Sequence, residues 1–437
     1  MTAEVAVMNK TAVALAADSA VTVTSSGGKK IYKTVDKLFM LSECEPVGIM
    51  IYGNGELMGI PWETIIKMHT KKLKNSKFNT LREYAEQFIE SLDNGNPLFP
   101  EEEQSSYIIG AIISIFAAMK EEINDEVDKV VEEEGEITKR RYQKITSTTI
   151  TKYHSALKAA EKLDSLHENH TEEIIIKYQK EIQAAREYIF EKLPIKITEN
   201  LDKKLTEIGG SLFSKDLFSP SLVSGIVIAG FGDNEIFPSL ISYLVEGVAN
   251  DRLKYKESGS NQINRENTGA IIPFAQKEMI YTFVQGVHPL YQAALDNYLD
   301  ELFKDYPTHI VDSLEGLTEA EEKKLIKKLK KVGDKLLDTC KENMVDYGLE
   351  NHIYPIINSV AVLPKEELAV VAESLINLSS WRKRVFMEDE TVGEPIDVAV
   401  ISKGDGFVWI KQKQYFDKTL NPHLNRQQEY LPTKQSE

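Results

Sequence analysis

The sequence predicts an α+β fold with large helical additions, and three observations support this prediction. Short apolar runs typical of β-strands occupy residues 2–53 and return at 221–256 and 396–413. Apolar residues at helical spacing follow the first strands and precede the last pair. Between the first two groups of strands, residues 101–212 are rich in charge and poor in glycine and proline, which favours long helices.

The chain is expected to begin with a β-hairpin that starts at its own terminus. Asn9-Lys10 is a short polar break between two apolar runs and suits a tight turn. With these two as the turn residues, Thr2 lies opposite Ala17, and Asp18 follows just past the end of the pairing. The strands expected before residue 54 are 2–8, 11–17, 20–24, 30–41 and 47–52.

The helices and strands expected after residue 54 have less regular sequence patterns. Two helices are expected at 57–73 and at 80–92, the second capped by Asn79-Thr80. Residues 101–212 suit an antiparallel helical hairpin or a short coiled coil. The later elements expected are strands 221–232, 239–248 and 252–256, a polar loop 256–269, a helix 273–286, a helical stretch 289–341 with a Thr318–Glu321 capping box, a helix opened by Leu363-Pro364, and strands 396–401 and 406–413.

Composition narrows the class of protein. The 68 acidic and 52 basic residues give a net charge of −16, which disfavours nucleic acid or an anionic membrane as a partner. Cys44 and Cys340 cannot form a disulfide framework and are expected to be buried apolar residues. The sequence has no apolar run of about 18 residues and no signal peptide, so we expect a soluble protein of the cytoplasm.

The N-terminal residues suggest a specific chemistry. Removal of Met1 would leave Thr2 with a hydroxyl and a free α-amine, whose unperturbed pKa is about 7.7–8.0. That amine can accept the proton of the hydroxyl and so activate a weak nucleophile. A nearby lysine would lower the pKa of both groups, and an aspartate would hold the lysine in place. Thr2, Asp18 and Lys30 are the candidates for these three roles.

These residues resemble the proteasome β-subunit type of N-terminal nucleophile (Ntn) hydrolase. Asp18 follows the N-terminal threonine in ALAADSAVT, and GGKKIYKTVDKLF then places Lys30 where the family has its catalytic lysine. In GIMIYGNGEL, Gly53 matches the family glycine whose backbone N–H forms the oxyanion hole. The resemblance covers residues 2–95, 220–290 and 365–415.

A distal segment, DETVGEPIDVAVISKGDGF, extends this resemblance. Asp389 and Gly393 match the family's aspartate and glycine. Val392 stands where the family has a serine, so one hydroxyl of the usual proton network is absent.

The resemblance implies a four-layer α/β/β/α sandwich of two antiparallel sheets. It implies a threonine-type peptidase that cleaves a peptide or protein substrate through Thr2, without a metal or organic cofactor. It also implies a homo-oligomer, and it leaves a regulatory protein partner open. The expected division is a discontinuous core at 2–100, 213–288 and 364–415, helical insertions at 101–212 and 289–363, and a disordered polar tail at 416–437.

Several alternatives stay open. Lys29 or Lys33 could replace Lys30, Gly55 rivals Gly53, and Asp389 could be an exposed helix-end acid. In function, the chain could instead be an Ntn amidase acting on a small amide. It could also be an inactive proteasome-like scaffold that acts through its helical insertions.

Three further motifs receive less specific interpretations. The segment GFGD at 230–233 lacks the third glycine and the lysine of phosphate-binding loops. HENH at 167–170 lacks a convincing third metal ligand and is expected to be a solvated helix face. The basic run KKLIKKLKK at 323–331 is expected to be a solvated amphipathic helix, or else a docking site for an acidic partner.

Overall fold

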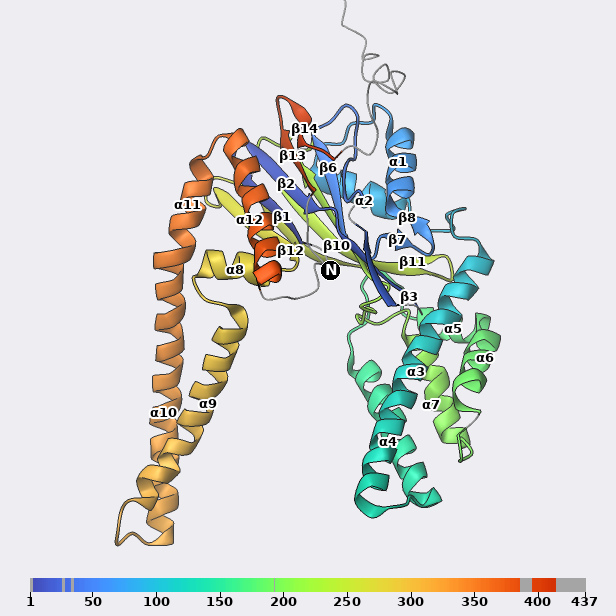
Figure 1. Ribbon diagram of the computed structural model, residues 1–437, viewed down its shortest axis with the longest axis vertical. Coiled ribbons are helices and arrows are strands. Elements are labelled where there is room, and N and C mark those ends of the chain that lie inside the picture. The colour runs from blue at the N-terminus through green and yellow to red at the C-terminus, as the bar shows by residue number, and fades with distance from the viewer. Residues whose placement is uncertain (1–2, 26–27, 33–34, 192, 386–394, 414–437) are drawn as a thin grey trace, which may run out of the picture. The chain divides into compact units, whose positions relative to one another are not determined.

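The computed structural model describes residues 3–25, 28–32, 35–191, 193–385 and 395–413, and for 21–32, 383 and 384 it describes the backbone alone. The chain divides into two compact units, one formed by Met1–Leu38 with Gln262–Glu437 and the other by Phe39–Asn261. Each unit combines a five-stranded antiparallel sheet with helices (Figure 1). The predicted α+β class is therefore confirmed, and the four-layer packing stays a prediction.

The sheet of the first unit has the strand order β12-β1-β2-β13-β14. Its members come from both ends of the chain, so the terminal hairpin is completed by strands more than 250 residues away. The elements of this unit are β1 (Ala3–Asn9), β2 (Ala12–Asp18), β3 (Val21–Ser25), β4 (Gly28–Tyr32), β12 (Gly269–Ala275), α8 (Glu278–Gln285), α9 (Pro289–Asp312), α10 (Glu319–Gly348), a π-helical turn (Leu349–Ile353), α11 (Tyr354–Val362), α12 (Lys365–Val385), β13 (Ile396–Ser402) and β14 (Gly406–Lys411).

The terminal hairpin forms, but in a different register from the predicted one. Glu4, not Thr2, lies opposite Ala17, so the partner of Ala17 shifts by two residues and the centre of the turn moves one residue along the chain, to Lys10-Thr11. Asn9 determines this turn because its Oδ1 accepts the Thr11 N–H at 2.9 Å, while its Nδ2 donates to the carbonyl of Leu363 at 2.8 Å. A buried asparagine thus ties the turn to the segment that precedes α12.

Helix α12 covers one face of this sheet. It packs on β1, β2 and β13, and Leu368 and Leu375 are buried as their helical spacing predicts. Every described residue of β1, β2 and β13 is buried, which agrees with their almost continuous apolar sequence.

The predicted helix at 273–286 is wrong in its first part. Pro273 lies in β12, opposite Val5 of β1. Because β12 is the edge strand of the sheet, proline can occupy it without removing an interior hydrogen bond. The helix, α8, begins at Glu278.

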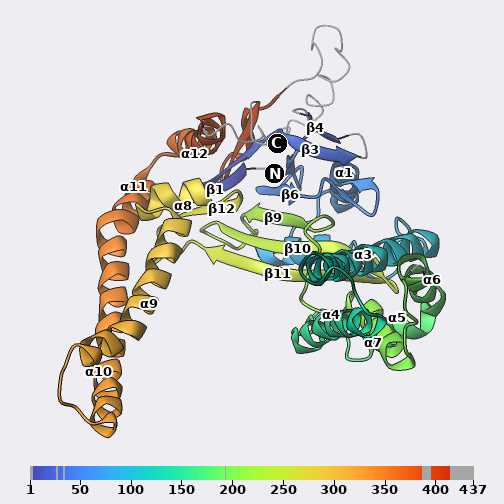
Figure 2. The ribbon, with the colours of Figure 1, turned by 60° about the horizontal axis from the view of Figure 1, so that its bottom comes forward.

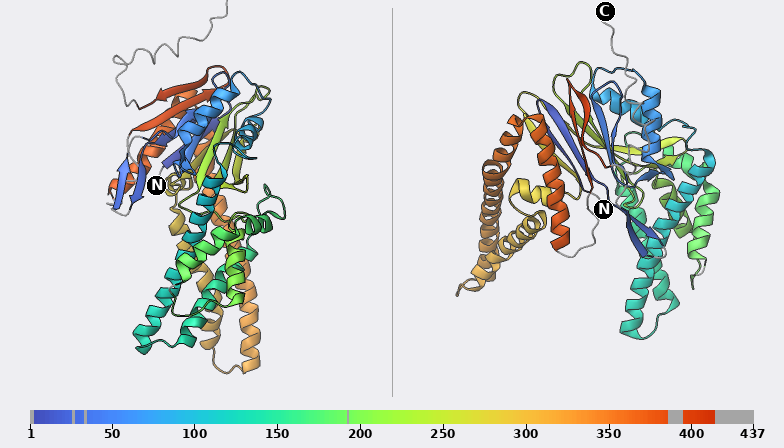
Figure 3. Two further views of the ribbon diagram at one scale, coloured as in Figure 1. Left: turned by 90° about the vertical axis from the view of Figure 1, so that its right-hand side faces the viewer. Right: turned by 45° about the horizontal axis from the view of Figure 1, so that its top comes forward.

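Helices α9 and α10 form a long antiparallel hairpin, visible in both views of Figure 3. The predicted capping box is present at the start of α10, where the Thr318 N–H donates to Glu321 Oε2 at 3.0 Å. This capping satisfies backbone donors that the helix itself leaves unpaired.

The sheet of the second unit has the order β11-β10-β9-β6-β5. Strand β11 continues through residues 256–262, where a loop was expected. The elements of this unit are β5 (Leu38–Met40), β6 (Val47–Gly53), β7 (Glu56–Leu57), β8 (Ile60–Pro61), α1 (Trp62–Leu73), α2 (Leu81–Glu90), α3 (Glu101–Glu134), α4 (Lys139–Ala159), α5 (His170–Lys177), α6 (Gln179–Phe190), α7 (Glu199–Ser211), β9 (Ser224–Gly230), β10 (Ser239–Ala249) and β11 (Arg252–Gln262).

The predicted insertion is larger and more compact than a helical hairpin. Helices α3 to α7 gather around an apolar core of their own, which includes Phe116, Ile150 and Leu205 (Figure 2). The prediction of a simple hairpin or coiled coil is wrong, because the chain folds back several times within 139–211.

A buried polar network joins the insertion to the sheet. Glu246 on β10 accepts from the Tyr107 hydroxyl of α3 at 3.0 Å and from the Ser219 N–H at 2.8 Å, and it pairs with Lys254 at 3.2 Å. Burial raises the pKa of Tyr107 well above its usual range and lowers the pKa of Lys254. The network satisfies polar groups that would otherwise destabilise this junction.

In the part of the chain that the structure describes, no helix has the length and apolar character needed to cross a membrane.

Candidate active site

Asp18 is the centre of a buried polar site at the open end of the terminal hairpin. It is the last residue of β2, lies opposite Ile396 of β13, and is 1% exposed. Its Oδ1 accepts the backbone N–H of Ala3 at 3.1 Å, and its Oδ2 accepts that of Ala20 at 3.3 Å. The Ala3 nitrogen belongs to the peptide bond that joins Thr2 to Ala3. Asp18 therefore contacts the backbone directly beside the predicted nucleophile.

The lysine that pairs with Asp18 is Lys37, a residue the sequence interpretation missed. Lys37 Nζ donates to Asp18 Oδ1 and to the carbonyl of Ala20, both at 2.7 Å. Lys37 is 4% exposed, so its ammonium is shielded from water and held by these two acceptors. The Ala3 N–H and the Lys37 ammonium share one carboxylate oxygen.

A second hairpin explains why Lys37 arrives at this place. Strands β3 and β4 pair with Val21 opposite Tyr32, so the chain after β4 returns toward the end of β2. The Val35 N–H donates to the Ser19 carbonyl at 3.3 Å, two residues before Lys37. The backbone of Lys30 instead pairs with Val23, inside the hairpin.

Lys413 holds the segment before Lys37 in position. Its Nζ donates to Ser19 Oγ at 2.8 Å and to the Val35 carbonyl at 2.7 Å, and it pairs with Asp397 at 2.8 Å and Asp36 at 2.9 Å. Lys413 thus connects the end of β2, the Lys37 segment and β13. The sequence interpretation did not anticipate it, because its partners are distant in the chain.

Gly53 ends β6 in the second unit. Its φ is +83°, and a Cβ at this position would lie 2.7 Å from the Val223 carbonyl oxygen. Only glycine fits this backbone without strain. Gly55, the alternative, has open space around its Cα.

Several predicted site residues lie outside the described part of the chain. These include Thr2, Asp389, Val392 and Gly393, as well as the polar tail. Lys30 is described only in its backbone, and its side chain is not. The predictions for these residues remain untested.

Comparison with known proteins gives little further information. No known family model matches the chain, and no curated protein does. A solved structure of an Anbu (Gly-1) mutant from Hyphomicrobium sp. strain MC1 aligns over 100% of each chain, at 9% identity and a TM-score of 0.27. A match at this TM-score carries no argument for fold or function.

Proposed function

We propose that this protein is a proteasome-like N-terminal threonine hydrolase that cleaves peptide bonds. Thr2 is the nucleophile after removal of Met1, and Asp18 and Lys37 prepare it for attack. In this proposal the two sheets form the α/β/β/α core of an Ntn hydrolase, and copies of the chain assemble into a homo-oligomer. The substrate is a peptide or a protein.

The observation that carries the proposal is the Asp18–Lys37 pair beside the Thr2–Ala3 peptide bond. Both side chains are buried, and one oxygen of Asp18 accepts from both Ala3 and Lys37. Placing two charges out of water is costly, and an apolar pair of similar size would serve stability as well. A buried lysine that shares a carboxylate oxygen with the Ala3 amide instead suits a site that must supply positive charge next to Thr2.

That positive charge has a chemical role in the proposed mechanism. A cation near Thr2 lowers the pKa of its α-amine from about 7.7–8.0, so more of the amine is a free base near neutral pH. The amine accepts the proton of Thr2 Oγ as this oxygen attacks the scissile carbonyl. It then protonates the leaving amine, and water hydrolyses the resulting ester to free Thr2.

The oxyanion of the tetrahedral intermediate needs backbone N–H donors. We assign this role to Gly53, whose positive φ and close approach to Val223 fix the backbone in one conformation. Asp389 is retained in the proposal as a group that assists proton transfer at Thr2.

Intact mass spectrometry with a peptide epoxyketone tests this function directly. The epoxyketone forms a ring adduct that needs both the hydroxyl and the free amine of one threonine. We expect purified protein to lack Met1 and to gain one adduct mass, and we expect the Thr2→Ala variant to gain none. Retained Met1 would contradict the self-activated threonine mechanism.

A processed terminus without an adduct would favour the small-amide amidase or the inactive scaffold. Hydrolysis of short amides by the same protein separates these two, because only the amidase releases free amine. Loss of that hydrolysis in the Thr2→Ala variant would place it at the same nucleophile.

A further inference from the structure

We propose that His167, His170 and Glu173 form a Zn²⁺ site at the start of α5 in the helical insertion. The site lies wholly within the second unit and plays no part in the proposed hydrolysis. From the sequence alone, the HENH segment at 167–170 lacked a convincing third metal ligand. Glu173, three residues beyond His170, supplies it.

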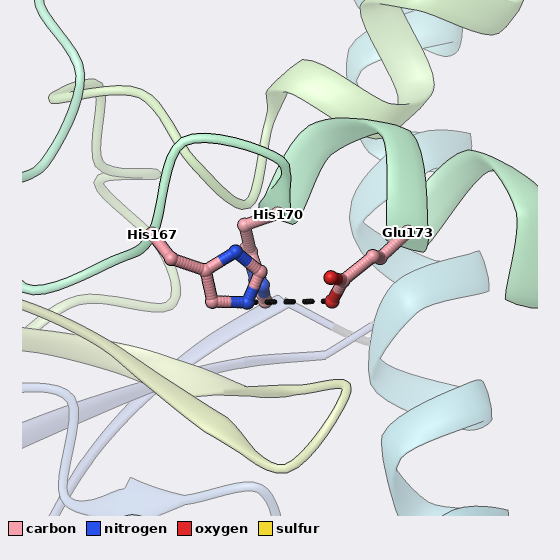
Figure 4. A group of neighbouring side chains, drawn as sticks. All are labelled: His167, His170 and Glu173. Atoms are coloured by element: carbon pink, nitrogen blue, oxygen red, sulfur yellow. Dashed lines mark ion pairs between the residues drawn. The ribbon is translucent and has the colours of Figure 1, made fainter.

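The three side chains already lie close enough for one ion. One ligand atom from each lies within 4.8 Å of the others, and Figure 4 shows them directed toward one another. His167 Nε2 lies 3.3 Å from Glu173 Oε2. A tetrahedral Zn²⁺ with bonds of about 2.0–2.1 Å separates neighbouring ligand atoms by about 3.3 Å. One edge of that tetrahedron is thus present, and closing the others needs only small movements of side chains.

His170 gives independent support for a ligand at this place. It is 0% exposed, and neither of its ring nitrogens has a hydrogen-bond partner. A buried polar atom without a partner destabilises a protein, so such atoms are rare and call for an explanation. A metal ion would supply the missing partner for one of these nitrogens. The expectation of a solvated helix face is therefore wrong for His170.

The local backbone brings these residues together. His170 and Glu173 are the first and fourth residues of α5, so they lie on one face of the helix. His167 lies in the turn before the helix, and its carbonyl accepts the His170 N–H at 3.2 Å. The imidazole rings of His167 and His170 meet edge to face, with centroids 5.4 Å apart.

The donor set favours Zn²⁺ over harder cations. Two imidazoles and one carboxylate form a common three-ligand set for zinc, with water in the fourth position. Ca²⁺ and Mg²⁺ prefer oxygen ligands.

The surrounding charges permit a cation. Asn250 Nδ2 donates to Glu173 Oε2 at 3.1 Å and orients the carboxylate. Arg252 is a positive group close to His170, but it pairs with Asp93 at 3.2 Å. Its charge is therefore largely balanced before an ion enters.

Titration of the full-length, tag-free, metal-depleted protein tests the site. We expect about one Zn²⁺ per chain by calorimetry, and a Co²⁺ complex whose visible absorption is typical of tetrahedral coordination. His167→Ala and Glu173→Gln should each weaken binding by at least about 100-fold, since even outer-shell partners are worth roughly 10- to 100-fold. Both residues are exposed, so these variants should keep the fold.

His309→Ala is the matched control, because His309 is an exposed histidine on α9. It should bind Zn²⁺ like the unchanged protein. Zn²⁺ should also raise the unfolding midpoint of the unchanged protein and of the control, but not of Glu173→Gln. Absence of binding in the unchanged protein, equal binding in every variant, or loss in only one of the two ligand variants would overturn the three-ligand site.

Discussion

Asp18 and Lys37 are both buried, and each charge is compensated by the other. Removing one partner of such a pair costs about 3–5 kcal/mol, since the remaining charge stays buried without compensation. We therefore expect Lys37→Met to lower the free energy of unfolding by about 3 kcal/mol and to abolish hydrolysis by Thr2. Chemical denaturation and the epoxyketone adduct measure the two effects.

Lys30→Met is the matched control for that experiment. The backbone of Lys30 lies inside the β3–β4 hairpin, opposite Val23. We expect this variant to change the free energy of unfolding by less than about 0.5 kcal/mol and to keep the adduct. Loss of the adduct in Lys30→Met, with retention in Lys37→Met, would return the catalytic role to Lys30.

The sequence placed Asp18 just past the expected end of the second strand, and in the structure Asp18 is the last residue of β2. The sequence did not identify the lysine that pairs with it. The spacing of apolar residues defined β1 and β2, and Asp18 followed directly from their ends. Which lysine reaches Asp18 depends on the register of the next hairpin. Gly27-Gly28 indicates a turn there but does not fix that register.

The burial of His69 predicts that the free energy of unfolding depends on pH. His69 is buried in a T-shaped ring contact with Phe88, and burial lowers its pKa from 6.5 to about 4, with Lys72 adding to the effect. Because the Ser91 hydroxyl donates to the Phe88 carbonyl, its oxygen accepts from His69 Nδ1–H. The neutral ring is thus the form that fits.

Protonation of His69 favours the unfolded chain, which binds protons more readily between pH 6.5 and 4. The contribution of neutral His69 is complete above about pH 6.5 and is lost as the pH falls toward 4, a change of about 3 kcal/mol. We expect His69→Leu to lose less stability than the unchanged protein across this interval in urea denaturation. Parallel curves for the two proteins would contradict this assignment.

At the scale of elements, Gly53 and Gly55 offer a matched pair at the end of β6. Alanine at 53 must adopt a positive φ and displace its Cβ from the Val223 carbonyl oxygen, whereas alanine at 55 meets no atom within 4 Å. We expect Gly53→Ala to lower the free energy of unfolding by about 1–2 kcal/mol or more. Gly55→Ala should change it little, and denaturation of both variants measures the difference.

The same pair tests the oxyanion role. Gly53→Ala should also reduce the rate of adduct formation, because it shifts the backbone N–H that the proposal uses. A reduced rate in Gly55→Ala alone would assign the oxyanion donor to Gly55.

Local signals predicted elements well where a single residue defines an end. The cap at Thr80 and the capping box at Thr318 both begin helices where the sequence places them. Pro273 misled the interpretation, because a proline after a polar loop suggests the start of a helix. Its place in an edge strand depends on pairing with β1, which no local pattern reveals.

At the scale of the whole chain, the sequence predicted groups of strands but not the sheets they form. The first strands divide between the two sheets, since β1 and β2 pair with β12 and β13, whereas β6 pairs with β9. All of these strands are mostly apolar and mostly buried, so composition does not distinguish their partners. Only long-range pairing assigns them.

The hairpin of α9 and α10 carries large apolar side chains that water reaches. Tyr291 is 64% exposed, Tyr298 is 63% exposed and Leu302 is 47% exposed, and all three lie on α9. Exposed apolar groups gathered along one helix are typical of protein interfaces. This surface suits the homo-oligomer that the proposed function includes.

We expect Tyr298→Glu to weaken that assembly. Aromatic residues at interface centres contribute about 2 kcal/mol or more, which corresponds to about 30-fold in the dissociation constant. Light scattering across a dilution series should therefore show dissociation at a higher concentration than for the unchanged protein. Asn297→Glu adds the same charge at the adjacent exposed position and should leave assembly unchanged. A monomer at every concentration of the unchanged protein, or equal weakening by both variants, would show that α9 does not form the interface.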